Sequence, residues 1–366
     1  MFYYILLFSL TTLLGFIADD LEARGHSNHK LRLQKRWMVF TILFIYVVFV
    51  GCRAESVGSD TYAYVSKLET ASSMALFEYL QSGFFIEPIF NTYVWLCAHI
   101  SSYHSFFFIL SSFFFFSVFL KFILKYSSSL GWSIWILNSM GFAVFALSTV
   151  RQTTAIAICL LSYMYMEKNY RKSWLLAIVA IGTHLSSAIY LPMMLVSKLN
   201  LKKIKSNMTI MLVCAVLIGP MLMGKLGAYY AATTGKYESD SLTGEGVGGY
   251  GMIAFLIVLL VMSVKSYFPI KKDLPPTFYY EFIAIGLALA VFVISRVNIA
   301  TIRLYWYYLA FSVVYIPNSF SLQRIQQRRV CQYAILVITI YYLSTNVLSS
   351  PYEESKLLLP YNFFWE

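Results

Sequence analysis

Several charged side chains lie inside or at the edge of strongly apolar stretches, where an unpaired charge costs several kcal/mol. Arg151 and Gln152 open the run TTAIAICLLSYMYM, and Glu87 stands in the aromatic run GFFIEPIF. His184 has small polar neighbours in AIGTHLSSAIYLP, which predicts a broken helix beside a wet cavity. Each also has an ordinary explanation: a guanidinium that reaches the headgroups, an interfacial glutamate and a packing histidine.

Another charged stretch, RAESVGSDTYAY, runs from Arg53 to Tyr64. It places Arg53 and Glu55 directly after an apolar run. Gly58 allows a tight turn that would fold Asp60 back toward the helix end. A solvated loop with a local ion pair fits the same residues.

Two more arginines, Arg296 and Arg303, surround a helix hairpin in ISRVNIATIRLYWYY. An arginine side chain is a planar, permanently charged fork that binds phosphate through two hydrogen bonds. Arg53, Arg151 and Arg303 on one side of a membrane would suit a phosphate or diphosphate, and nearby aromatic residues would suit sugar rings. No His, Cys and Asp cluster has metal-ligand spacing, and the 5 scattered cysteines predict neither a disulfide framework nor a metal site.

The elements that hold these residues are predicted to be membrane spans. Hydrophobic residues make up 59% of the chain and charged residues only 12%, which excludes an ordinary soluble domain. The net charge of +11 comes from short Lys and Arg clusters between apolar runs, so we interpret it as an orientation signal and not as a nucleic-acid surface. The first apolar run lacks the basic start and cleavage site of a secretory signal, so a retained span is expected.

The predicted fold class is all-α: a single integral membrane domain, residues 1–366, built as a polytopic bundle of about 10–12 transmembrane helices. Apolar stretches long enough to span a bilayer lie near residues 2–17, 37–52, 105–123, 151–166, 207–224, 250–268, 277–295, 301–318 and 330–349. Three further apolar segments, 84–102, 131–149 and 173–197, are harder to assign.

Basic residues in short loops predict the orientation. The lysines and arginines of the loops near 18–36, 198–205, 265–272 and 324–329 are expected in the cytoplasm. The acidic loops, about 53–83 and 225–249, and the N-terminus are then expected in the periplasm.

The middle of the chain allows two topologies, because an odd number of crossings must lie between the outer loop and the next cytoplasmic lysines. Five crossings would leave Lys168, Arg171 and Lys172 outside. Three crossings, with 84–102 and 173–197 re-entrant or broken, keep this cluster inside and place Arg151 at the outer face. We favour three crossings.

These motifs resemble the EpsG-type membrane proteins of bacterial polysaccharide biosynthesis, which include the Wzy-class O-antigen polymerases. The resemblance rests on R-x-E-x-x-G-x-D-T-x-x-Y from Arg53 to Tyr64, Glu87-Pro88, Arg151-Gln152 before a small-residue helix, and His184 with its serines. It covers roughly residues 1–200, and beyond them only hydropathy agrees. The chain has Ser59-Asp60 where the family often reads Gly-Thr-Asp.

The resemblance implies a GT-C-like bundle in the bacterial inner membrane that polymerises oligosaccharide units carried on undecaprenyl diphosphate, at the periplasmic face. An acceptor hydroxyl attacks the anomeric carbon of the growing chain, and undecaprenyl diphosphate leaves. No cofactor or metal is expected if arginines neutralise the diphosphate. The implied partners are the lipid-linked glycan, the bilayer and a chain-length regulator.

Each candidate residue then has an expected role. The diphosphate is assigned to Arg151 and Arg303, with support from Arg53. The candidate base for the acceptor hydroxyl is His184 or Asp60, and Glu87 is expected to orient a sugar or to hold an arginine. The remaining substrate contacts are assigned to Glu55, Gln152, Tyr64 and Arg296.

Two other functional classes remain open. A flippase for lipid-linked oligosaccharide would also use a basic cavity, but flippases are usually built from two related halves, and none are evident. A membrane O-acyltransferase acting on the same glycan would use a histidine paired with an acid near the outer face, and His184 is the candidate for it.

Overall fold

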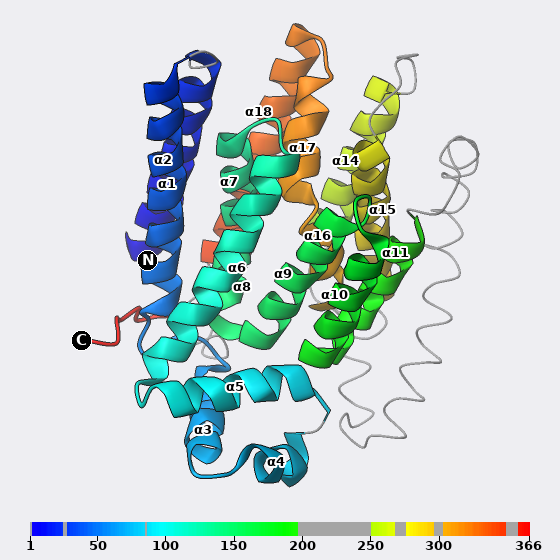
Figure 1. Ribbon diagram of the computed structural model, residues 1–366. Coiled ribbons are helices and arrows are strands. Elements are labelled where there is room, and N and C mark those ends of the chain that lie inside the picture. Colours follow the sequence, from blue (N-terminus) through cyan, green and yellow to red (C-terminus); the bar gives the residue numbers. More distant parts are fainter. Residues whose placement is uncertain are drawn as a thin grey trace. The chain divides into compact units, whose positions relative to one another are not determined.

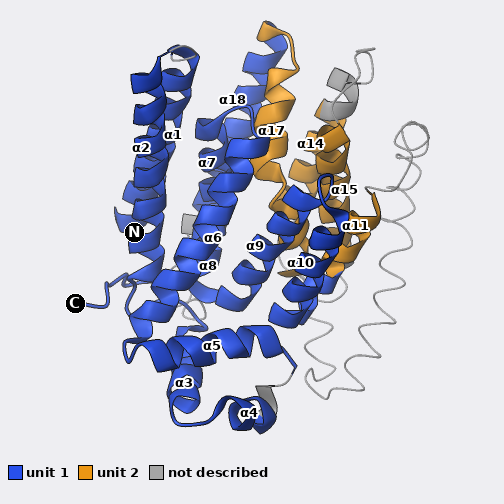
Figure 2. Ribbon diagram, viewed as in Figure 1, with its two compact units in different colours: residues 1–188, 326–366 blue, residues 189–325 orange. Residues whose placement is uncertain are grey.

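The computed structural model describes residues 2–24, 28–84, 86–196, 250–267, 276–295, 303–348 and 358–366. Within these ranges the chain is helical, without strands and with one isolated β-bridge between Arg53 and Phe363. The protein is therefore an all-α polytopic membrane bundle, as predicted. It divides into two compact units, residues 1–188 with 326–366 and residues 189–325 (Figure 2).

Unit 1 contains both ends of the chain and most of the described helices (Figure 1). They are α1 (Phe2–Arg24), α2 (His29–Tyr46), α3 (Thr61–Ser72), α4 (Leu76–Tyr79), α5 (Pro88–Ile100), α6 (His104–Tyr126), α7 (Leu130–Ser139), α8 (Phe142–Ser148), α9 (Val150–Tyr165), α10 (Tyr170–Thr183) and α18 (Ile325–Tyr342). Short π-helical turns follow α2, α4 and α18, at Val47–Gly51, Leu80–Phe84 and Leu343–Leu348.

Unit 2 is arranged around α15 (Pro276–Ser295). The four other described α-helices of this unit all contact it: α11 (Leu191–Val196), α14 (Tyr250–Tyr267), α16 (Trp306–Leu309) and α17 (Ser312–Ser321). Inside the unit, Asn318 Nδ2 of α17 donates a hydrogen bond of 3.1 Å to the buried carboxyl of Glu281 on α15.

Four described helices are long and apolar enough to cross a membrane: Phe2–Arg24, His29–Gly51, His104–Tyr126 and Pro276–Val293. They agree with four of the predicted spans. Helices α7 and α8 meet at an angle of 48° and would form a fifth span if the bent pair crosses as one, which explains why 131–149 was hard to assign. The predicted span 207–224 and the loop 225–249 lie outside the described residues, so the total of about 10–12 stays a prediction.

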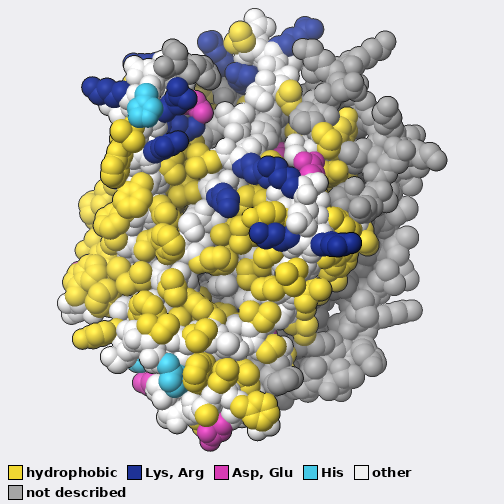
Figure 3. All heavy atoms as spheres, viewed as in Figure 1, with side chains coloured by type: hydrophobic (Ala, Val, Ile, Leu, Met, Phe, Trp, Pro, Cys, Tyr) yellow, Lys and Arg dark blue, Asp and Glu magenta, His cyan; other side chains and the backbone are white. Residues whose placement is uncertain are grey.

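The long helices of unit 1 carry an apolar outer surface, visible as a broad hydrophobic region in Figure 3. Trp37, Phe40 and Phe44 are exposed on α2, and Leu175 and Ile178 are exposed on α10. Large apolar side chains along the outside of long helices are what a lipid bilayer solvates.

The helices of unit 1 run between two ends (Figure 1). At the end where α9 finishes, Lys125 donates to a backbone carbonyl at 2.9 Å, and Lys172 Nζ lies 4.0 Å from the ring centre of Tyr165. Arg151 lies at the opposite end, in the first turn of α9. Helix α10 starts at the basic end and leads back to His184 beside Glu87, so α6, α7 with α8, α9 and α10 all run between the two ends. The number of membrane crossings in this part of the chain therefore stays a prediction.

At the Arg151 end, α3, α4 and α5 form a group that we call the cap. Residues 53–83, predicted as an outer loop, contain α3 and α4, and α5 lies across the ends of the long helices (Figure 1). Tyr64 and Leu68 of α3, Phe90 of α5 and Phe107 of α6 belong to one buried cluster. The cap is therefore packed onto the bundle and can hold polar side chains in fixed positions.

Candidate functional site

Glu87 brings together two other residues that the sequence singled out. Its Oε2 lies 2.7 Å from Arg151 Nη1, and its Oε1 lies 2.5 Å from His184 Nδ1. The side chain of Glu87 is only 10% exposed, whereas the side chains of Arg151 and His184 are 36% and 23% exposed. A buried carboxylate thus holds two partly accessible side chains, and we call these three residues the Glu87 cluster.

The start of α5 fixes the position of Glu87. Pro88 occupies the first turn of the helix, where its missing N–H costs no hydrogen bond, and Glu87 is the N-cap residue. The Glu87 carbonyl accepts hydrogen bonds of 3.0 Å from both the backbone N–H and the side-chain amide of Asn91. The Glu87 backbone is therefore anchored while its carboxylate points to α9 and α10.

His184 lies at a break in the helix, as the sequence predicted. Helix α10 ends at Thr183, His184 has extended backbone angles (φ −151°, ψ 117°), and a 3-10 helix follows at Leu185–Tyr190. Just before the break, α10 comes close to α5. The approach is so tight at Gly182 that an added Cβ would lie 2.7 Å from Ile89 Cδ1. This approach brings the imidazole within reach of Glu87.

Arg151 is placed by the first turn of α9 and by Tyr64 of the cap. The Tyr64 hydroxyl accepts a hydrogen bond of 3.2 Å from the Arg151 backbone N–H, one of the groups that a helix leaves unpaired at its N-terminus. The nearby Glu87 carboxylate also interacts favourably with the positive end of the helix dipole. Helix α9 and α3 thus share a fixed contact at the site.

Opposing effects act on the pKa of Glu87. Burial acts to raise it, but the hydrogen bond from His184 and the charge of Arg151 outweigh burial and lower the pKa to about 2. Glu87 is therefore ionised at neutral pH and is a poor proton acceptor. Its geometry and charge suit a positioning role.

Lys67 is a cation at this site that the sequence analysis missed. It lies on α3 three residues after Tyr64, on the same helix face, and interacts electrostatically with Arg151 and Glu87. Burial and the Arg151 charge lower the pKa of Lys67 to about 8, although Glu87 opposes this. Its spacing from Tyr64 was the available signal, but the segment had been predicted as a loop.

Asp60 and Gln152 lie beside the cluster and not within it. Asp60 precedes α3, accepts a hydrogen bond of 3.1 Å from the Ser59 hydroxyl, and interacts electrostatically with Tyr64. The turn expected at Gly58 is present, with φ 96°. Gln152 is 3% exposed and therefore faces the protein interior.

Arg53 makes a different set of contacts from those of the Glu87 cluster. It is 1% exposed, with Nη1 donating to the Val50 carbonyl at 2.6 Å and its guanidinium carbon 4.2 Å from the centre of the Phe108 ring. Its backbone pairs with Phe363 near the C-terminus. Arg53 thus stabilises the junction between α2 and the C-terminal segment, and its support of a diphosphate stays a prediction.

Glu55 pairs with a histidine that the sequence analysis did not single out. Glu55 Oε1 lies 2.6 Å from Nδ1 of His104, the first residue of α6. Their separation of 49 positions in the sequence made this pair impossible to recognise from local spacing. It lies on unit 1 outside the Glu87 cluster.

The remaining predicted arginines belong to unit 2. Arg303 is exposed at the start of a short 3-10 turn, and Arg296 lies outside the described residues. In the described part of the chain, no group of three or more His, Cys, Asp or Glu side chains could hold a metal ion.

The Glu87 cluster can combine proton transfer with anion binding. Because a carboxylate only accepts hydrogen bonds, Nδ1 of His184 carries the hydrogen, and Nε2 remains as the ring position for a substrate. A neutral imidazole held in this way can accept a proton at Nε2. Arg151 and Lys67 attract a negatively charged group to the same place.

A comparison with protein families identifies the chain. The model of the EpsG family matches residues 36–363, which include Arg53, Glu87, Arg151 and His184. The comparisons with curated proteins and with solved structures gave no match. The motifs lie in the first 200 residues, and the family match extends well beyond them. Because it covers nearly the whole sequence, this protein belongs to the EpsG family, a family of Wzy-like polymerases.

Proposed function

We propose that this protein polymerises oligosaccharide repeat units, carried on undecaprenyl diphosphate, into O-antigen or a related surface polysaccharide at the periplasmic face of the bacterial inner membrane. Membership of the EpsG family supports a polysaccharide-polymerase-like role in a membrane. The observation that carries the specific proposal is the Glu87 cluster, which holds a cation and a histidine together at one end of unit 1.

In the proposed reaction, the acceptor sugar hydroxyl attacks the anomeric carbon of the donor glycan. A carbon–oxygen bond forms between acceptor and donor, and the bond between the anomeric carbon and the diphosphate breaks. The hydroxyl proton passes to His184 Nε2, and undecaprenyl diphosphate leaves with its electron pair. Because the leaving group already carries phosphates, the protein's main tasks are to orient two bulky substrates and to neutralise developing charge.

Each member of the site has a separate part in this proposal. Arg151 and Lys67 bind the diphosphate, and His184 acts as the base. Glu87 sets the His184 tautomer and the Arg151 orientation, because each of its oxygens is already bonded to one of them. Arg303 remains a proposed second diphosphate ligand.

Replacement of Arg151 tests the proposal in cells that lack the chromosomal gene. Arg151→Ala should abolish long polymer, leave single repeat units on the lipid core and keep the protein level unchanged. Arg151→Lys should give intermediate polymer, because lysine keeps the charge but loses the two-pronged hydrogen bond. Gel analysis of the polysaccharide measures the polymer and the single repeat units, and immunoblotting measures the protein level.

Arg171→Ala is the matched control, because Arg171 is an exposed arginine in the first turn of α10, away from the cluster. It should give the normal ladder. Normal long chains from Arg151→Ala would refute the assignment. Deletion of the gene separates the classes: a flippase deletion leaves no repeat unit on the core, and an acyltransferase deletion leaves the full ladder.

A further inference from the structure

A second carboxylate–histidine pair lies on unit 1, away from the Glu87 cluster. Glu55 follows α2 and its π-helical turn, His104 begins α6, and their side chains meet at 2.6 Å. The side chains are 47% and 27% exposed, so both can still contact a ligand. The carboxylate fixes Nδ1 of the ring and leaves Nε2 for another hydrogen bond.

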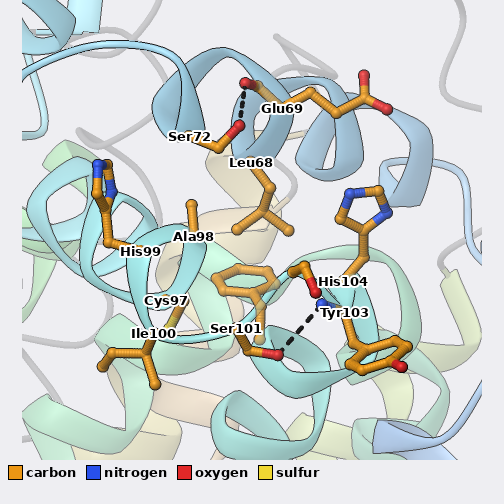
Figure 4. A pocket seen from close by; sticks show the side chains of 12 residues that line it. Leu68, Glu69, Ser72, Cys97, Ala98, His99, Ile100, Ser101, Tyr103 and His104 are labelled. Atoms are coloured by element: carbon orange, nitrogen blue, oxygen red, sulfur yellow. Dashed lines mark hydrogen bonds between the residues drawn. The ribbon is translucent and has the colours of Figure 1, made fainter.

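Two cavities lie on either side of the segment Ser101–His104. The first has a volume of about 380 Å³ and lies between α3, α5 and the start of α6 (Figure 4). The second has a volume of about 470 Å³ and lies between residues 53–56, the start of α6 and the C-terminal residues 362–366. Ser102, Tyr103 and His104 line both cavities, so the two are neighbours on either side of this segment, and we call the pair the groove.

The groove presents many hydrogen-bonding groups together with aromatic rings. Figure 4 shows Glu69 on α3 near the His104 side of the first cavity, and His99 at its other side. Tyr103 is 76% exposed between the cavities, and Phe364 lines the second cavity. Convergent carboxylate, imidazole and hydroxyl groups bind sugar hydroxyls, while aromatic faces pack on the apolar face of a sugar ring.

The lining argues against two other classes of ligand. Arg53 also lines the second cavity, but its guanidinium is buried against Phe108 and the Val50 carbonyl, so the carboxylates of Glu55, Glu69 and Glu366 dominate and would repel an anion. They would also be costly beside an acyl chain. A third cavity of about 500 Å³ contrasts with the groove, because it is lined mainly by apolar side chains of α2 and α6 such as Phe40 and Leu43. Both groove cavities fall within the range of about 300–1,000 Å³ that is typical of small-ligand sites.

The groove and the Glu87 cluster share helix α3. Lys67 faces Arg151 and Glu87, whereas the next residues, Leu68 and Glu69, line the first cavity. An α-helix is about 10 Å wide, so a chain of a few sugars could reach from one site to the other.

We propose that this groove binds uncharged sugar residues of the lipid-linked glycan, beyond the sugar that reacts at the Glu87 cluster. The proposal rests on the proposed polymerase function. Tyr103 provides the stacking surface, and the Glu55–His104 pair provides directed hydrogen bonds. Binding along the groove keeps the growing chain attached between additions.

The test separates groove binding from catalysis. The protein, purified in lipid nanodiscs, is mixed with oligosaccharides released by mild acid from the surface polysaccharide of the same strain, and saturation-transfer NMR measures binding. Tyr103→Ala with His104→Gln should weaken binding about tenfold or more, as expected for the loss of one stacking contact and one hydrogen bond. Arg151→Ala should bind these lipid-free sugars normally.

Polymer length in cells provides the second measurement. Tyr103→Ala with His104→Gln should still make polymer but shift the ladder to shorter chains. Tyr62→Ala is the matched control, because Tyr62 is a 55% exposed tyrosine of the cap that does not line either cavity. Unchanged binding in the double variant would overturn the groove proposal, whereas long polymer from Arg151→Ala would overturn the polymerase assignment and leave the NMR result standing.

Discussion

At the residue scale, the site depends on one carboxylate with two partners. Glu87 uses Oε1 for His184 and Oε2 for Arg151, so both of its oxygens are bonded within the protein. Its low pKa keeps the negative charge that both partners need. The contribution of this ionised carboxylate is present above the ordinary Glu pKa of 4.5 and is lost only as pH falls toward about 2. We therefore propose Glu87 as a positioning residue, in keeping with the expectation that it holds an arginine.

Lys67 leads to a prediction about alkaline pH. Its charged form, which we propose binds the diphosphate, is lost as pH rises through about 8. The facing groups keep their charge states there: Arg151 stays cationic, Glu87 stays ionised, and burial raises the pKa of Tyr64. In membranes supplied with lipid-linked repeat units, the polymerisation rate should therefore fall above about pH 8 in the natural protein.

Lys67→Arg should keep activity at pH 7 and extend the plateau to higher pH, because arginine remains charged. Lys67→Ala should lower the rate at every pH. Ser66→Ala, at the neighbouring exposed position on α3, should leave the profile unchanged. If the polymerisation rate of Lys67→Arg falls above about pH 8 as it does in the natural protein, Lys67 does not bind the diphosphate.

At the element scale, local backbone features bring the cluster together. Pro88 begins α5 at Glu87, α10 stops at Thr183 so that His184 can turn toward α5, and Tyr64 joins α3 to α9. The turn at Gly58 leads into α3 and touches α8. These short features set positions that long helices alone would leave undefined.

Gly58→Ala should destabilise the cap. Gly58 has φ 96°, and an added Cβ would lie 2.2 Å from the Leu147 carbonyl oxygen, a contact that the backbone must move to relieve. Strain of this kind costs about 1–3 kcal/mol or more, so the melting temperature and polymer synthesis should both fall. Thermal unfolding of the purified protein measures the first effect, and the ladder measures the second.

Gly251→Ala provides the control for this change. A Cβ at Gly251 meets no atom within 4 Å, and alanine favours the helix in which this residue lies. The control should be as stable as the natural protein or slightly more stable. Equal melting temperatures for Gly58→Ala and the natural protein would show that the turn tolerates a side chain.

At the scale of the whole molecule, unit 1 separates its basic end from its cap. Lys125 and Lys172 lie near the last turn of α9, whereas the Glu87 cluster lies at the first turn. The rule that basic loops stay in the cytoplasm predicts that the cap faces the periplasm. The C-terminal segment contacts the cap end, because the Ala54 N–H donates to the Asn362 carbonyl at 2.9 Å.

Cysteine labelling tests this orientation. In an active variant without native cysteines, Ser73→Cys on the cap should react with a membrane-impermeant maleimide in spheroplasts. Lys168→Cys should react only after the membrane is permeabilised. Both positions are exposed in the structure, so access within the protein is matched. Labelling in the reverse order would place the Glu87 cluster in the cytoplasm and contradict the proposed reaction.

The sequence alone was sufficient for features that depend on local composition. Apolar length predicted the all-α membrane bundle, and small polar residues around His184 predicted the helix break. Because burying a charge is costly, the sequence also pointed to Glu87, Arg151 and His184. These three side chains are in contact in the structure. Motif order also pointed to the EpsG family, which the family match confirmed.

Only the tertiary structure decided which of the charged residues meet. Arg151 and His184 are 64 and 97 residues away from Glu87 in the sequence, and no periodic pattern encodes contacts between such distant segments. The interactions of Lys67 with the Glu87 cluster and of His104 with Glu55 depend on the packing of α3, α5 and α6, so the sequence did not predict them. Arg53 and Arg151 are both arginines next to apolar runs, but packing buries Arg53 against Phe108 and the C-terminal segment. The sequence shows that a charge lies in an apolar stretch, where burial is costly. Which partner offsets this cost depends on how distant segments pack together.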